Sequence, residues 1–225
     1  MIIFQIPALI PPISEEFRTL KLVFVLPKAW ISLGECIWWD KVQIKDKVAI
    51  NVQYASVRQL FVDFLGVSIP DLGMLVEELK NVATSSRSVQ RAKTLIWEIN
   101  SLDPAAEDLT SIYESPIFPV KIGNEDARLA SRETEFAIVD HKKLASAFMD
   151  PNSMGVLSVL DCSNIDEVRK LQPFLAGLKI ENRYLSNVVK ETTSLSDDAK
   201  RSTEHDVLLT ANLRRRAYAL SRYAL

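Results

Sequence analysis

Three segments in the first half of the chain carry apolar residues at the spacing of an amphipathic helix. These segments are 54–66, 70–82 and 88–102. Apolar side chains that recur every three or four residues line one face of a helix, and that face packs against a core. Gly66 is a stop signal at the end of the first segment. In the second segment Pro70 suits the first turn of the helix, and Asp71 favours the helix N-terminus. We therefore predict a small helical subdomain of three helices.

Branched and aromatic residues predict strands before these helices. Leu20–Leu26 and Ala29–Trp38 have this composition, and Pro27 separates them. Residues 1–13 are apolar but contain three prolines, so they predict an apolar strand followed by a proline turn. This stretch lacks a basic region and is too short to span a bilayer, so we expect neither a signal peptide nor a transmembrane segment.

Three tryptophans, Trp30, Trp38 and Trp39, lie close together in this region and predict an aromatic cluster. Packing in the core is the favoured interpretation, and an aromatic platform for a ligand is the alternative.

The second half has shorter apolar runs, which predict strands at 117–122, 127–131, 135–140 and 155–161. The sequence GNED predicts a turn between the first two strands. Helices are expected at 141–149 and at 164–178, where Asn164 is a plausible cap and Pro173 should bend the helix. The expected fold class is α+β and helix-rich: N-terminal strands and the helical subdomain come first, followed by a small, mostly antiparallel sheet with flanking helices and a long C-terminal helix.

An acidic stretch marks the expected boundary between two subdomains. Between Asp103 and Glu135 there are eight acidic and three basic residues, which is typical of a solvated surface. The predicted division is therefore 1–102 for the strands and helical subdomain, 103–116 for an acidic linker and 117–225 for an α+β subdomain.

Composition argues against several kinds of catalytic or cofactor site. The six glycines do not cluster into a phosphate-binding loop. Two cysteines and two histidines, scattered along the chain, predict neither a disulfide framework nor a zinc site. Asp140 and His141 are adjacent, but a surface histidine beside a helix N-terminus is the favoured interpretation over a catalytic pair. We expect no enzyme activity and no cofactor, and an intracellular protein, cytoplasmic or nuclear, with reduced thiols.

The C-terminal segment 206–225 predicts a basic amphipathic helix. Its apolar stripe is Leu209, Leu213, Ala217, Leu220 and Ala224. Residues 199–225 contain six basic and two acidic side chains. Packing on its own domain, or on a missing continuation of the chain, is the favoured interpretation. The alternative is binding of nucleic acid or another anionic surface through five arginines: Arg201, Arg214, Arg215, Arg216 and Arg222. This alternative is disfavoured, because so few cations give only weak affinity for phosphate.

The segment Glu181–Glu191 predicts a second amphipathic helix, with one apolar and one polar face. The apolar face is Tyr184, Leu185, Val188 and Val189. Together with the C-terminal helix it supplies the candidate interaction residues: Arg183, Tyr184, Asn187, Glu191, Leu213, Arg214, Arg215, Arg216, Leu220 and Arg222.

Several blocks, in this order, carry a family resemblance: WISLGECIWW, LFVDFLGVSIPDLGMLVEELKNV, IFPVKI, EFAIVDHKKLASAFM and EVRKLQPFLAGLKIENRYLSNVVKE. They resemble the downstream region of very large fungal proteins related to the plant NO VEIN protein and, more distantly, to sacsin. Those proteins carry a GHKL-type ATPase domain (gyrase B, histidine kinase, heat-shock chaperone) far upstream.

The resemblance covers roughly Trp30 to Glu191, and it implies a non-catalytic accessory segment of a chaperone-like ATPase. No ATP-site residue carries over, because the Mg-binding asparagine helix and the DxGxG-type loop of that domain are both missing from this sequence. We therefore expect a fragment whose partners are proteins, either neighbouring regions of a larger polypeptide or another chain.

Overall fold

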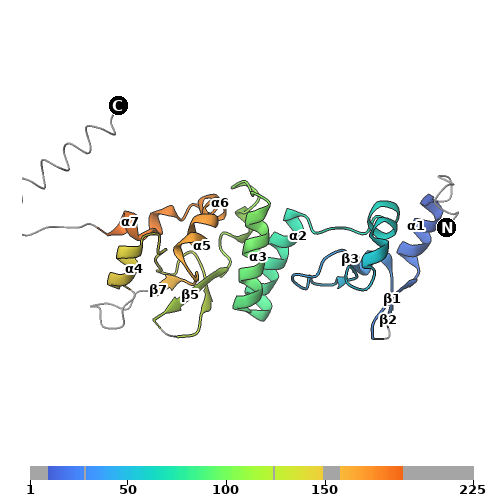
Figure 1. The fold of residues 1–225 in the computed structure, drawn as a ribbon, viewed down its shortest axis with the longest axis horizontal. Coiled ribbons are helices and arrows are strands. Elements are labelled where there is room, and N and C mark those ends of the chain that lie inside the picture. Colours follow the sequence, from blue (N-terminus) through green and yellow to red (C-terminus); the bar gives the residue numbers. More distant parts are fainter. Residues whose placement is uncertain (1–9, 28, 124, 149–157, 190–225) are drawn as a thin grey trace, which may run out of the picture. The chain divides into compact units, whose positions relative to one another are not determined.

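The computed structural model describes residues 10–27, 29–123, 125–148 and 158–189, and these adopt an α+β fold, as the sequence predicted (Figure 1). The α-helices are α1 Ile10–Thr19, α2 Leu72–Asn81, α3 Val89–Ser101, α4 Lys142–Phe148, α5 Ile165–Lys170, α6 Gln172–Gly177 and α7 Leu185–Val188. The strands are β1 Val23–Val25, β2 Ala29–Ile31, β3 Cys36–Ile37, β4 Val48–Ala49, β5 Phe118–Ile122, β6 Arg128–Ala130 and β7 Ser158–Leu160. The predicted C-terminal helix, 206–225, lies outside the described residues.

Helix α1 corrects the prediction of a strand and proline turn over residues 10–13. Pro11 and Pro12 occupy its first turn. A proline is tolerated there because the first N–H groups of a helix have no partner within the helix. Residues 1–9, the rest of the predicted strand, lie outside the described part of the chain.

The predicted strand Ala29–Trp38 is interrupted in its middle by a short 3₁₀ turn, η3 (Leu33–Glu35). The carboxylate of Glu35 accepts hydrogen bonds from the backbone N–H and the hydroxyl of Ser32, at 2.8 and 2.7 Å. These local bonds replace the ladder bonds that a continuous strand would make. Beyond the turn, β3 pairs in parallel with β4.

The first predicted helix, 54–66, forms only irregular turns: a 3₁₀ turn η4 (Ala55–Val57) and a π-helix η5 (Gln59–Phe64). Gly66 ends it with a φ of 71°, so the predicted stop is confirmed. Phe61 and Leu65 are buried, and they pack against the inner side of β1 and β2 in a first core.

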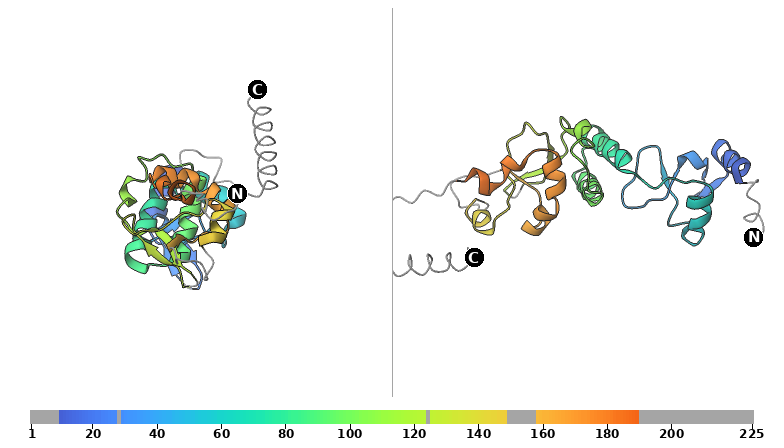
Figure 2. Two further views of the ribbon diagram at one scale, coloured as in Figure 1. Left: turned by 90° about the vertical axis from the view of Figure 1, so that its left-hand side faces the viewer. Right: turned by 90° about the horizontal axis from the view of Figure 1, so that it is seen from above.

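Helices α2 and α3 form as their apolar stripes predicted, and Asp71 lies at the N-terminus of α2 as expected. The side chain of Asp71 accepts a hydrogen bond from the Met74 N–H at 2.8 Å, and Ser88 accepts one from the Arg91 N–H at 3.4 Å. Pro70 precedes the cap instead of lying in the first turn. A π-helical turn, η6 (Val82–Ser86), follows α2 directly. The two helices run side by side (Figure 2), and their buried stripes belong to a second core.

The second-half sheet is three-stranded and antiparallel, with β5 between β6 and β7. The predicted strand 135–140 forms single bridges only, from Ala137 to Val159 and from Ile138 to Tyr184. The predicted helix 164–178 divides into α5 and α6, because Pro173 lies in the first turn of a new helix. The amide of Asn100 donates to the Lys170 carbonyl and accepts from the Phe174 N–H, so α3 satisfies the backbone at this break.

The acidic segment 103–116 is not solvated throughout. Within it lies a 3₁₀ turn, η7 (Thr110–Ile112), and Leu109 and Ile112 are fully buried in the second core. The hydroxyl of Tyr113 donates to the Gly177 carbonyl at 2.9 Å. The division of the chain into subdomains at this segment stays a prediction, but its apolar residues are part of the core.

Candidate functional site

The β1–β2 hairpin has one buried and one exposed apolar face. Val23 and Ile31 point into the first core and are 1% and 7% exposed. Side chains alternate along a strand, so Phe24 and Trp30, the strand neighbours of these two residues, point the other way. These two residues and the exposed leucines that flank β1 are called the hairpin face: Leu20, Leu22, Phe24, Leu26 and Trp30. Leu26 is 68% exposed and Trp30 is 58% exposed.

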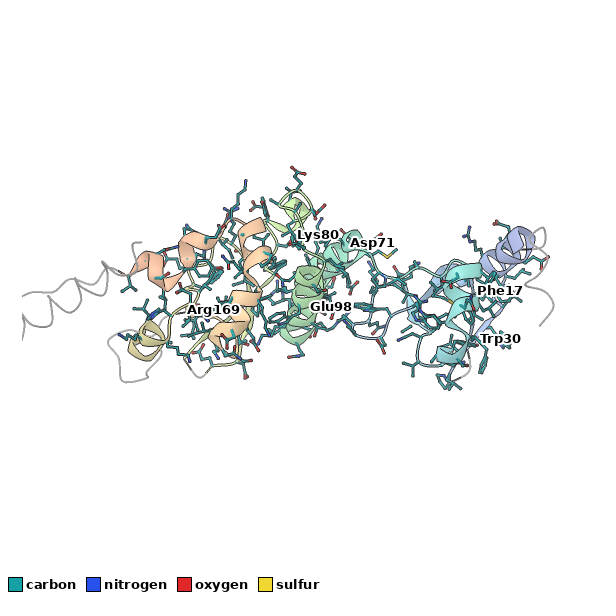
Figure 3. The ribbon with its side chains drawn as sticks, turned by 45° about the horizontal axis from the view of Figure 1, so that its top comes forward. Phe17, Trp30, Asp71, Lys80, Glu98 and Arg169 are labelled. Carbon is teal, nitrogen blue, oxygen red and sulfur yellow. The ribbon has the colours of Figure 1, made fainter. Side chains whose placement is uncertain are left out.

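Trp30 lies at the surface of the molecule (Figure 3) and packs on its cross-strand neighbour Phe24. The two ring centroids are 5.2 Å apart, with an interplanar angle of 59°. Such a tilted pair holds both rings in fixed positions. The hairpin face is therefore an ordered apolar surface.

The two edges of the hairpin differ. The carbonyl of Phe24 in β1 accepts hydrogen bonds from the Gln53 amide at 2.9 Å and from the Tyr54 hydroxyl at 2.7 Å. Gln53 also accepts from the Leu26 N–H at 3.1 Å. Side chains thus close the edge of β1. Among the described residues β2 pairs with β1 alone.

The predicted cluster of three tryptophans does not form. Trp38 packs near Phe61 at the first core, with ring centroids 6.3 Å apart, and Trp39 packs against the second core. Trp38 and Trp39 thus pack against the cores as predicted. The prediction of core packing is wrong for Trp30, which is exposed. The unbroken apolar run from Leu22 to Leu26 could have revealed an exposed second face, because only one face of a two-stranded hairpin meets this core.

Arg183, a predicted interaction residue, is used inside the fold. Its guanidinium donates to the carbonyl of Thr134 at 2.5 Å and to that of Arg132, and it lies 4.3 Å from the ring centroid of Phe136. Burial lowers the pKa of Arg183, and the nearby Arg132 lowers it further. Arg183 therefore joins its own segment to 132–136.

The predicted helix 181–191 is also broken. A 3₁₀ turn, η8 (Glu181–Arg183), is followed by extended backbone at Tyr184 and by the single-turn helix α7. Tyr184 is half-buried against the second core, and burial together with the charge of Glu181 raises its pKa. Asn187 is exposed, but its amide donates to the Glu181 carbonyl at 2.8 Å. The remaining predicted interaction residues lie outside the described residues: Glu191, Leu213, Arg214, Arg215, Arg216, Leu220 and Arg222.

Asp140 and His141, the alternative catalytic pair, directly precede α4. The carboxylate of Asp140 accepts hydrogen bonds from the backbone N–H of Ser186, at 3.1 Å, and from its hydroxyl. These bonds attach Asp140 to α7. His141 is exposed.

The two cysteines are free thiols in apolar surroundings. Burial, with a smaller contribution from Glu35, raises the pKa of Cys36 to about 11, and burial with Glu167 raises that of Cys162 to about 12. Both are therefore protonated at neutral pH, unlike a reactive thiolate. In the described ranges, no group of three or more His, Cys, Asp or Glu side chains is placed to hold a metal ion. No helix in this part of the chain has the length and apolarity needed to cross a membrane.

Fold and surface together define a small α+β protein with an ordered apolar hairpin face. Residues 73–189, just over half of the chain, match the family described as Domain of unknown function (DUF8348), and the chain belongs to this family. The match begins in α2 and runs through α7, so it includes the three-stranded sheet but excludes the hairpin. No curated protein and no solved structure matches the chain.

Proposed function

We propose that this chain is a non-catalytic protein-interaction module that binds an extended apolar protein segment at the hairpin face. The observation that carries the proposal is the combination of a strand, β2, that pairs with β1 alone among the described residues with an ordered apolar face on the same hairpin. A partner strand that pairs with β2 would bury its own side chains beside Trp30 while the backbones form ladder hydrogen bonds.

The charges of the hairpin narrow the chemistry of the partner. Residues 20–31 contain two lysines, Lys21 and Lys28, and no acidic residue. The partner segment is therefore an apolar strand with acidic residues at its ends. Main-chain pairing supplies affinity, and the apolar side chains together with the acidic ends supply specificity.

The resemblance to the downstream region of large chaperone-like ATPases supports the same role. An accessory segment in such a protein needs surfaces that pack on neighbouring regions of the polypeptide or on another chain. We therefore propose a protein partner and assign no catalytic step to the described residues.

A peptide titration tests this proposal. The probe is a fluorescein-labelled peptide that alternates valine and threonine between acidic ends. Its control is the same peptide with a central proline, which cannot complete the ladder. Fluorescence anisotropy with the full chain should show binding of the first peptide only.

Trp30→Thr is the matched perturbation of the protein. Threonine keeps a high strand propensity, and the lost ring is mostly exposed, so circular dichroism should stay unchanged. We expect at least about tenfold weaker peptide binding, because aromatic anchors dominate such interfaces. The control is Leu102→Thr, at an exposed apolar residue after α3, which should leave binding unchanged.

Equal affinity of wild type and Trp30→Thr, or equal binding of the two peptides, would overturn the proposal. Light scattering measures whether the chain forms a dimer. If it does, and if Trp30→Thr makes it monomeric, the hairpin face binds a second copy of the chain, and the proposed partner is wrong.

A further inference from the structure

A cavity of about 330 Å³ lies within the second core, between α3, the strands β5 and β7, and the helices α5 and α6. Its volume falls within the range of small-molecule sites. Every residue that lines it belongs to the segment 73–189 that matches the family. The cavity shares no residue with the hairpin face, so an inference from it does not depend on the proposed function.

One part of the cavity wall is apolar. Buried side chains from four elements and from the residue before α6 form it: Ile96 of α3, Phe118 of β5, Leu160 of β7, Phe174 and Leu175 of α6, and Leu171. Water held against such walls makes few hydrogen bonds, so an apolar group that replaces it is favoured.

The polar groups gather on one side of the cavity, around Asp161. Its carboxylate receives the ammonium of Lys93 at 2.7 Å and that of Lys121 at 3.2 Å. Burial alone would raise the pKa of Asp161, but the hydrogen bonds from the two lysines outweigh burial and lower it. The Asp161 N–H donates to the Pro119 carbonyl at 2.7 Å, which fixes the position of this carboxylate.

The hydrogen-bond donors and acceptors around Asp161 can be counted. Lys93 and Lys121 each carry three N–H donors, and each gives one to a different oxygen of Asp161. The other carboxylate that lines the cavity, Glu167, accepts from the Ser163 N–H at 2.6 Å, as the start of α5 requires. Lys93, Asp161 and Glu167 line the cavity and Lys121 pairs with Asp161, so two carboxylates match the two lysines. Lys93 nevertheless keeps N–H donors for a ligand.

We propose that this cavity binds a small carboxylic acid with an apolar body, whose carboxylate pairs with Lys93 while its body lies between Phe118, Leu160 and Phe174. A carboxylate supplies acceptors for the remaining N–H donors of Lys93, and a charge-assisted hydrogen bond of this kind is stronger than a neutral one. At about 30 Å³ per water-sized group, the cavity holds about eleven such groups, which corresponds to a phenylalkanoic or medium-chain alkanoic acid.

Calorimetric titration of the full chain tests the proposal with three probes. They are 4-phenylbutyrate, octanoate and the neutral isostere 4-phenylbutanamide. We expect at least one acid to bind with a Kd on the order of 1 mM or lower, and the amide to bind at least about tenfold more weakly than 4-phenylbutyrate. The ratio between the two acids distinguishes an aromatic from an alkyl body.

Lys93→Met removes the charge and keeps the aliphatic stem. It should weaken binding of the acid by at least about tenfold and leave weak binding of the amide unchanged. The control is Lys41→Met, which breaks a similar pair with Glu98, at 2.7 Å, outside the cavity. This control should bind the acid as the wild type does.

If Lys93→Met does not fold, an NMR titration of the wild type tests the location of the binding site instead. Amide shifts on addition of 4-phenylbutyrate or octanoate should concentrate at 93–97 and 160–163. Failure of both acids to bind, equal binding of acid and amide, or shifts centred elsewhere would each overturn the proposal.

Discussion

Gly177, the last residue of α6, provides a sharp test of how the acidic segment packs. It is buried, and a Cβ added there would lie 2.8 Å from Cδ1 of Leu109 and 3.8 Å from Cα of Ala106. Two carbon atoms are most stable at roughly 3.5–4.0 Å, so Gly177→Ala requires Leu109 to move by about 0.7 Å or more. Leu109 is fully buried, so it has little free space to move into.

The expected cost of Gly177→Ala follows from two opposing effects. Overpacking a well-packed core costs about 1–3 kcal/mol. Replacing glycine by alanine in a helix raises the free energy of unfolding by at most about 1 kcal/mol, and by less at a helix end. The net loss in the free energy of unfolding is therefore about 1–2 kcal/mol. With a urea m-value of about 2 kcal/mol/M, the midpoint should fall by roughly 0.5–1 M.

Gly73→Ala is the matched control, because it makes the same change in the first turn of α2. There the added Cβ would lie 3.5 Å from Oδ1 of Asp71, which is an ordinary contact. We expect this variant to have the stability of the wild type or up to about 1 kcal/mol more. Urea unfolding followed by circular dichroism compares the two variants under the same conditions.

A double-mutant cycle with Leu109→Ala identifies the contact. Leu109→Ala alone should cost about 2–5 kcal/mol, because it leaves a cavity. In that background Gly177→Ala should cost less than in the wild type, because the clashing atom is gone. If the two changes are additive, or if Gly177→Ala behaves like Gly73→Ala, then Leu109 does not pack on α6 and the segment 103–116 is a solvated linker after all.

Two further predictions concern a buried carboxylate and the thiols. Glu78 is 3% exposed, and its carboxylate accepts hydrogen bonds from Arg91 at 2.8 Å and from the Lys45 N–H at 2.9 Å. Glu78→Gln should therefore lower the free energy of unfolding by about 2–3 kcal/mol, whereas Glu77→Gln on the exposed side of α2 should change it little. Equal urea midpoints of these two variants would contradict this prediction. Burial raises the pKa of Cys36 to about 11 and of Cys162 to about 12. Because their protonated forms are favoured in the folded state, the stability that they contribute is complete below the unfolded pKa of about 8.5 and is lost as the pH rises through about 11–12. Mass spectrometry should show slower iodoacetamide alkylation of both thiols in the folded than in the urea-unfolded chain, and equal rates would refute their burial.

Local signals in the sequence were sufficient for α2 and α3, although they did not predict α1. Asp71 caps α2, and the apolar stripes of α2 and α3 repeat over several turns. Asn164 and Pro173 likewise predicted where α5 begins and why α6 is separate. Each of these signals acts within a few residues, so a single sequence contains it.

Features that depend on distant partners could not be predicted in this way. The apolar spacing of 54–66 fits a helix, yet Phe61 and Leu65 meet the hairpin core through an irregular turn. The charge of Arg183 suggested a surface contact, but its acceptors are carbonyls about fifty positions earlier. The acidic composition of 103–116 likewise concealed the burial of Leu109. In each case long-range packing overrides the local pattern.

The packed unit around the proposed cavity is larger than the segment that matches the family. Ile37, Val42 and Ile44 precede that segment, yet they are buried in the same core as α2 and α3. The backbone N–H of Lys45 also donates to the carboxylate of Glu78. The carbonyl of Gln43 accepts from the guanidinium of Arg91, which pairs with Glu78. A chain that began at residue 73 would expose apolar surface on α2 and α3 and leave Glu78 with one partner fewer. Loss of binding in such a fragment would therefore report lost packing, so the cavity and the hairpin face should both be tested in the whole chain, where the buried core that supports α3 is intact.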